Sequence, residues 1–189
     1  MASDLRFEIE RVRERDLWWK AEVCLPSWQG FQSRRGAYAA RDSLDVSDGM
    51  TELVFAPEGR GVEPLQPDEI ELVQWVIDRE SWLSAALLEA LLQEYPRLQE
   101  LYGYEGDERA ELMPDVRSID DFRRLIGISS VYVHQLRNDG TPYVGFELGC
   151  TWDDEHGLGV LMHGARIVKV GGADTAFTLW IARRDAEGV

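Results

Sequence analysis

The chain has 189 residues, 44% of them hydrophobic, and a formal net charge of −15 at pH 7. This length and composition suffice for one domain with a buried core, so intrinsic disorder is not expected. No stretch approaches the roughly 18 consecutive apolar residues of a membrane span, and the N-terminal segment lacks the apolar core of a signal peptide. We therefore expect a cytoplasmic protein that binds neither membranes nor, given its charge, nucleic acids.

The first third of the chain, residues 1–66, has the alternating pattern of β-strands. Apolar residues occupy every second position of residues 5–9 and again of residues 17–25. This pattern is typical of half-buried strands that pair with each other. A glycine- and arginine-rich loop follows, and the segment MTELVFA at 50–56 predicts a third strand.

The middle segment, residues 67–126, is helical and acidic. Pro67 predicts a helix start, Pro96 predicts a stop after Tyr95, and we expect a break near 78–81. Trp75 and Trp82 are expected in the core because tryptophan burial is strongly favourable. Residues 97–117 resemble an irregular connection. Residues 118–127 predict a short helix with a capping box at its start and Gly127 at its end.

The charge is concentrated in this middle segment. Residues 68–121 contain 15 acidic and 4 basic residues, a net charge of −11. Such a surface attracts a basic protein partner, although acidic helix faces also occur simply as solvated, solubilising surfaces. Both interpretations remain open from the sequence.

The last third, residues 127–189, predicts four antiparallel strands. Two hairpin turns separate them, one at 138–140 (Asn-Asp-Gly) and one at 164–165. Together these elements predict a single α+β domain over 1–189. Its antiparallel sheet combines the N-terminal strands with the C-terminal four-strand meander, and the central helical segment packs on one face.

The stretch CTWDDEHGLGVLMHG at 150–164 holds the densest group of reactive side chains. Antiparallel pairing predicts that Cys150 and His163 approach one rim of the sheet. We propose a binding rim there, at Trp152, Asp153, Asp154, Glu155 and His156.

Two chemical alternatives use the same stretch. Asp153, Glu155, His156 and His163 have suitable donors for a metal ion, although no known ligand spacing is matched. Cys150 with a histidine and Asp153 has the components of a nucleophilic site. A third interpretation is structural, because glycines permit tight turns, acids cap amides and Trp152 can cover the core. We assign no residue as catalytic and no cofactor beyond that possible metal.

Several of these residues also carry a family resemblance. The run from Tyr143 to Phe177, with its Trp-Asp-x-Glu-His-Gly-x-Gly element at 152–159, resembles the bacterial family of unknown function DUF6985, as do the segments 87–96 and 118–127. The resemblance implies a small bacterial cytoplasmic protein and supplies no catalytic residues. Proteins of this general type often accompany secreted toxins as immunity partners.

Two functional classes therefore follow from the sequence. We expect a non-enzymatic protein-binding domain, in the form of an immunity protein that neutralises a cognate basic toxin. The alternative is a metal-assisted hydrolase that uses the cluster at 153–163.

Overall fold

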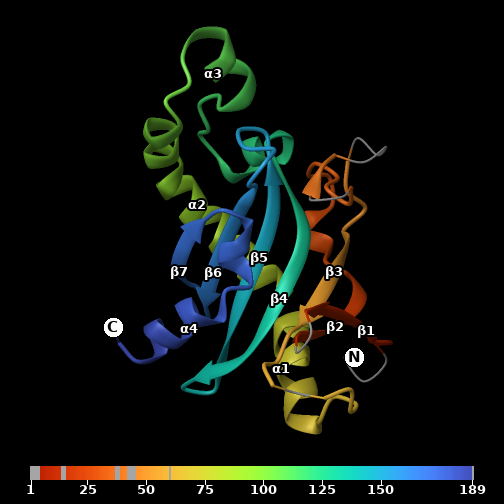
Figure 1. Ribbon diagram of the computed structural model, residues 1–189. Helices are drawn as coiled ribbons and strands as arrows, with labels where there is room; N and C mark the ends of the chain where they lie inside the picture. Colours follow the sequence, from red (N-terminus) through yellow and green to blue (C-terminus); the bar gives the residue numbers. More distant parts are fainter. Residues whose placement is uncertain (1–4, 14–15, 37–38, 42–45, 60, 189) are drawn as a thin grey trace.

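The computed structural model describes residues 5–13, 16–36, 39–41, 46–59 and 61–188. Its centre is one seven-stranded sheet whose strands lie in chain order (Figure 1). The strands are β1 (Glu8–Arg13), β2 (Asp16–Cys24), β3 (Met50–Phe55), β4 (Ile126–Asn138), β5 (Thr141–Cys150), β6 (Leu158–His163) and β7 (Arg166–Gly171). All the strands predicted from the sequence are present.

The sheet is mixed, because β3 and β4 run parallel while every other neighbouring pair is antiparallel. The prediction of an antiparallel sheet is therefore wrong at this one junction. The physical reason is the helical segment, which connects β3 to β4. A crossover of this kind returns the chain to the end of the sheet where β3 began, so the next strand runs in the same direction.

The helices lie mainly in this crossover. They are α1 (Pro67–Asp78), α2 (Glu80–Tyr102) and α3 (Gly106–Leu112), followed by the short 3-10 helix η4 (Ile119–Arg124). Pro67 is in the first turn and the predicted break falls between α1 and α2, which confirms both predictions. The capping box of Ser118 and Asp121 is also present.

Pro96 does not end a helix, contrary to the prediction. It lies inside α2, which continues to Tyr102 and ends at Gly103 with a left-handed φ of 65°. Tyr95 and Leu98, on either side of the proline, are buried in the core. Their packing holds the helix together across the missing backbone donor. Gly127 likewise does not stop a helix, since it lies inside β4.

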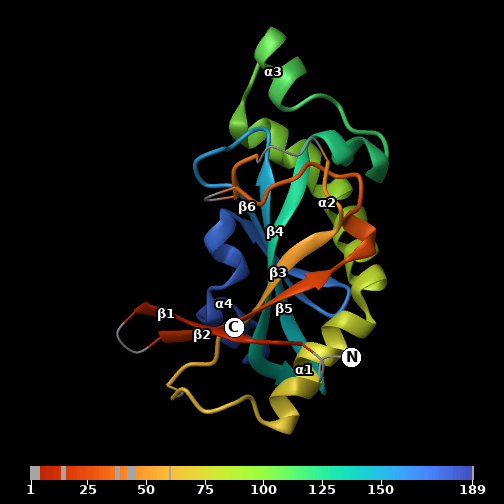
Figure 2. The same cartoon turned by 90° about the vertical axis from the view of Figure 1, so that its right-hand side faces the viewer.

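One face of the sheet packs against α1 and α2 and forms the main core (Figure 2). The buried helix residues include Leu83, Leu87 and Leu91, and the strand residues in contact are the inward members of the alternating pattern. The Trp28 indole donates a hydrogen bond of 2.9 Å to Ser84 Oγ, which fixes a loop against α2. The fold is therefore of the α+β class, with α1 and α2 packed against this face.

Trp75 and Trp82 contact each other edge to face, with ring centroids 6.2 Å apart. Trp82 is 47% exposed, so the prediction that both belong to the core is wrong for Trp82. The chain turns at Arg79, between α1 and α2, and therefore the two rings do not share one buried helix face.

The other face is covered only in part. The short helices η5 (Ala173–Ala176) and α4 (Leu179–Ala186) pack over β4, β5 and β6. Gly145 permits the close approach, because a Cβ atom there would lie 1.7 Å from the carbonyl oxygen of Ala176. Ala176 of η5 packs on Val54 of β3, and Phe177 contacts Trp18 of β2. Among the described residues, the part of this face that carries Glu22 and Glu52 stays open. No helix in the described part of the chain is long and apolar enough to span a membrane.

Candidate functional site

The open face carries a row of polar side chains that crosses four neighbouring strands. Glu22 pairs with Glu52, Glu52 with Ser130, and Ser130 with Glu147. Paired residues point to the same face of a sheet, and neighbouring strands lie only about 4.8 Å apart. Three carboxylates are therefore brought together by the register alone.

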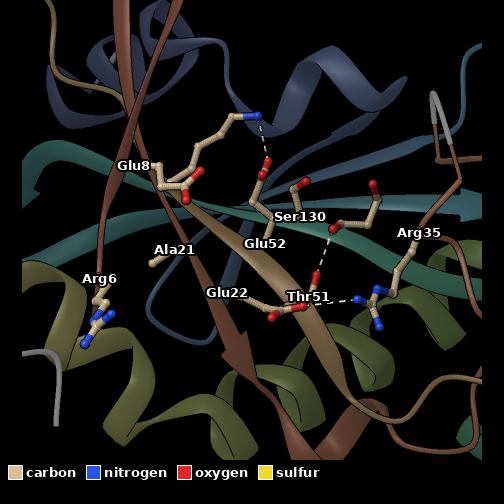
Figure 3. A pocket seen from close by; sticks show the side chains of 10 residues that line it. Arg6, Glu8, Ala21, Glu22, Arg35, Thr51, Glu52 and Ser130 are labelled. Carbon is tan, nitrogen blue, oxygen red and sulfur yellow. Dashed lines mark hydrogen bonds and ion pairs between the residues drawn. The ribbon is translucent and has the colours of Figure 1, made fainter. Parts of the chain in front are cut away.

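A cavity of ≈ 470 Å³ lies over this row (Figure 3). Its floor includes three small residues, Ala21, Thr51 and Ser130, which are all buried. Charged side chains form the walls, with Arg6 and Glu8 on one side and Arg35 on the other. We call this cavity the open-face pocket; its lining residues are Arg6, Glu8, Lys20, Ala21, Glu22, Arg35, Thr51, Glu52, Ser129 and Ser130.

Lys20 is held between two carboxylates in this pocket. Its Nζ atom lies 2.9 Å from Oε1 of Glu52 and 2.5 Å from Oε2 of Glu10. Burial lowers the pKa of Lys20, but the hydrogen bonds and charges of the two glutamates outweigh that effect and leave the pKa above its ordinary value. Lys20 is therefore a permanent cation with two anionic partners.

Arg35 is paired in the same way on the opposite wall. Its guanidinium lies 3.1 Å from Oε1 of Glu22 and 3.7 Å from Oδ2 of Asp48. Lys20 and Arg35 each have two carboxylate partners. Each of these two clusters therefore has one more negative than positive charge. The lining of the pocket is itself balanced, with three basic and three acidic side chains. The excess of acid comes from Glu10 and Asp48, which pair with Lys20 and Arg35 without lining the pocket.

Glu147 adjoins the pocket on β5 and is the last carboxyl group of the row. Burial raises the pKa of Glu147, and the nearby charge of Glu52 adds to this, against the opposing hydrogen bond from Tyr132. The Tyr132 hydroxyl donates that bond over 2.9 Å to Oε2 of Glu147. A carboxyl group with a raised pKa beside a cleft is typical of functional sites.

Aromatic rings border the same polar row. Trp18 contacts Tyr132 and Phe177, with ring centroids 5.5 and 5.9 Å apart, and Lys20 lies 5.5 Å from the centroid of the Trp18 ring. Phe177 is 39% exposed. An exposed aromatic next to a charged cavity is a common arrangement at protein interfaces.

The binding rim predicted at 152–156 divides into buried and exposed members. Trp152 is buried, and its backbone carbonyl accepts a hydrogen bond of 2.8 Å from the Tyr104 hydroxyl. Asp153 accepts hydrogen bonds from the Tyr102 hydroxyl at 2.9 Å and from the backbone N–H of His156 at 2.8 Å. These two residues hold the loop in place, whereas Asp154, Glu155 and His156 are exposed.

The four candidate metal ligands are not all brought together. His156 precedes β6 and His163 ends it, so the strand separates them by its whole length. The His163 ring contacts the Asn138 carbonyl oxygen through Nε2 at 3.1 Å. Among the described residues, no group of three or more histidine, cysteine or acidic side chains is placed to hold a metal ion.

The predicted approach of Cys150 to His163 is also wrong. In the sheet Cys150 pairs with Ile126, whereas His163 pairs with Tyr143 at the other end of β5. The antiparallel register of β5 and β6 separates the two because they occupy opposite ends of their hairpin. Burial raises the pKa of the Cys150 thiol to about 12, which leaves it unreactive at neutral pH.

The residues of the open-face pocket were not predicted from the sequence. Lys20 and Glu22 occupy polar positions between the apolar residues of the alternating segment 17–25, and Glu147 lies in an otherwise apolar segment. A glutamate within an apolar strand was the one available signal, because a carboxyl group that is partly buried there needs a partner.

Comparison with known proteins adds a family to this geometry. The model of a family described as a domain of unknown function (DUF6985) matches residues 34–177. The chain belongs to the DUF6985 family. This match confirms the resemblance predicted from the sequence. The matched region includes β3 to β7, the loop at 152–156, Glu52 and Glu147 of the polar row, and Arg35 of the pocket wall. No curated protein and no solved structure matches the chain.

Proposed function

We propose that this chain is a non-enzymatic binding domain that recognises a basic protein through the open-face pocket. The observation that carries the proposal is that Lys20 and Arg35, which line a concave site, each have two carboxylate partners. With the flanking Glu10 and Asp48, the acidic side chains in and around the site outnumber the basic ones. A lysine or arginine side chain of a partner would complement that excess. Charge pairs at a partly desolvated position contribute to specificity and to the rate of association.

Two further features support a protein partner over a free metal ion or small cation. The aromatic rings of Trp18 and Phe177 offer apolar contact area beside the charged cavity. The helical layer adds a strongly acidic surface, and α3 at its tip has no buried residue and lies beyond the end of the sheet (Figure 1). Both would favour a partner with a basic surface.

Within this class, we propose the neutralisation of a basic toxin, as an immunity protein does. An acidic protein of this kind blocks a basic active-site cleft by covering it. The hydrolase alternative has less support, because His163 lies away from Asp153, Glu155 and His156. The hydrogen bonds of Trp152 and Asp153 favour a structural role for that loop.

Native mass spectrometry of the protein purified from its own host without chelator tests this proposal. We expect a complex with a basic protein that forms with the wild type and with Glu155→Gln but is lost in the double variant Glu22→Gln/Glu52→Gln. Glu155→Gln is the control because it removes an exposed carboxylate outside the open-face pocket.

Two outcomes contradict the proposal. A complex that persists in the double variant would place the interface elsewhere. A stoichiometric metal that chelator removes, and that is absent from the His156→Ala/His163→Ala variant, would instead support the hydrolase.

A further inference from the structure

Arg34 is an arginine whose side chain is only 3% exposed, although arginine is rarely buried to this extent. A cross-strand pair of glycines, Gly127 on β4 and Gly149 on β5, creates the space for it. A Cβ atom at Gly127 would lie 2.8 Å from Cγ of Arg34, and one at Gly149 would lie 2.6 Å from its Cδ. The sheet is therefore shaped to seat this side chain.

The buried guanidinium has only weak compensation for its charge. Its Nε donates a hydrogen bond of 2.9 Å to Oε1 of Gln32, which is a neutral partner. Its Nη1 lies 3.5 Å from the Ala39 carbonyl oxygen and 3.4 Å from Oδ1 of Asp154. Ion pairs of good geometry have N···O distances of about 2.7–2.9 Å, so the contact with Asp154 is a loose one.

Asp154 is also poorly fixed by its surroundings, because its side chain is 83% exposed. Burial lowers the pKa of Arg34 despite the opposing influence of the Asp154 carboxylate. Within the described part of the chain, the one carboxylate partner of this buried cation is distant and solvent-exposed. Such a cation can exchange that partner for another anion.

A cavity of ≈ 380 Å³ adjoins the guanidinium. Arg34 and Arg41 both line it, together with Thr151, Glu111 and Asp154. Two arginines that line one cavity are suited to bind an oxyanion, because guanidinium groups bind carboxylate and phosphate oxygens in a bidentate way. The carboxylates of Glu111 and Asp154 oppose this and would weaken the affinity.

We propose that this cavity is a binding site for a small oxyanion, a carboxylate or a phosphate, in which Arg34 is the buried receptor and Arg41 the outer one. Asp154 occupies the place of the anion when the site is empty and competes with it. The site lies between the β2–β3 loop, which carries Arg34 and Arg41, the end of α3 and the loop after β5, and it shares no lining residue with the open-face pocket. The inference is therefore independent of the proposed protein partner.

NMR titration at constant ionic strength tests this site, with inorganic phosphate and acetate as separate probes and the Nε–H signal of Arg34 as the reporter. We expect saturable binding of at least one probe. Asp154→Asn should tighten binding by roughly threefold or more, because it removes the competing carboxylate, and Arg41→Gln should weaken it by a similar factor. Tighter binding of phosphate than of acetate would identify phosphate as the preferred group, and the reverse order a carboxylate.

Asp139→Asn is the matched control, because it makes the same chemical change at an exposed position far from the site. Asp139 lies in the β4–β5 turn, whereas Thr151, which lines the cavity, follows the opposite end of that hairpin. It should leave the affinity unchanged. Two results overturn the proposal: no saturable shift of the Arg34 signal in either the wild type or Asp154→Asn, or equal affinities in Asp154→Asn and Asp139→Asn. Neither Asp154 nor Asp139 is buried, so both variants are expected to fold.

Discussion

The two faces of the sheet are built from the same strands but are used differently. On the face covered by α1 and α2, alternate residues such as Leu53 and Phe146 form one continuous apolar core. On the other face the intervening positions carry Glu52 and Glu147, and only η5 and α4 cover part of it. The comparison indicates that one face provides most of the stability, whereas the open part of the other is available for binding.

The largest expected effect is on the helix-covered face. Leu87 is fully buried between α2 and the sheet, so Leu87→Ala should lower the free energy of unfolding by about 2–5 kcal/mol. Chemical denaturation measures this loss. The matched change on the open face, Glu52→Ala, should cost less than about 1 kcal/mol, because it removes one partly exposed ion pair. Equal losses would contradict the division between the faces.

A second test concerns the covered half of the other face. Gly145→Ala places a methyl group 1.7 Å from the Ala176 carbonyl oxygen, so η5 must move. We expect a loss of about 1–3 kcal/mol, the usual cost of overpacking. Thermal unfolding measures the loss, and hydrogen exchange should show faster exchange in η5 and α4 than in α2. Unchanged exchange in η5 would show that these contacts are not tight.

A third test compares two carboxylates of different role. Asp153 accepts hydrogen bonds from the Tyr102 hydroxyl and the His156 backbone on the helix-covered side. Asp153→Ala should therefore cost about 1–2 kcal/mol, in the range of a lost cap. Glu155→Ala in the same loop should change the stability by less than about 0.5 kcal/mol, because Glu155 is exposed. Denaturant titration of both variants measures the two losses. Equal losses would contradict the structural role of Asp153 in the loop at 152–156.

The smallest effect concerns Glu147. Its pKa is raised in the folded protein, so the folded state holds this proton more tightly than the unfolded state does. The stability contribution therefore falls as the pH rises from the unfolded pKa, about 4.3, through the higher folded pKa. Glu147→Gln removes this loss and should raise Tm at pH 7 by about 2 °C, with no such gain at pH 4. A lower Tm at pH 7 would mean that the ionised carboxylate is stabilising.

Much of the fold follows from local patterns in the sequence. The strands were predicted because apolar and polar residues alternate strongly along them. The turn at 138–140 was predicted because its Asn-Asp-Gly sequence favours positive φ angles, and Asp139 and Gly140 do adopt φ angles of 49° and 75°. The parallel β3–β4 pair and the course of α2 through Pro96 were not, because both depend on packing between distant segments. Helix α4 also escaped prediction, since only one of its eight residues is buried.

The candidate site was harder to predict than the fold. A site was predicted in the stretch at 150–164 because its reactive residues are close together in the sequence. In the structure, strand β6 separates His163 from the others. Glu22, Glu52 and Glu147 are far apart in the sequence and meet only through the strand register. A single sequence does not reveal such a row, because each member alone resembles an ordinary outward-facing strand residue.

The most direct test of the central claim is an NMR titration of the wild-type protein with N-acetyl-arginine methylamide, a free model of a partner's basic side chain. We predict saturable shifts at the backbone amides of Ala21, Thr51 and Ser130, with affinity lost in Glu22→Gln/Glu52→Gln and retained in Glu155→Gln. Absence of saturable shifts at these amides, or equal affinity in the double variant, would contradict the assignment of the open-face pocket as a site for a basic side chain.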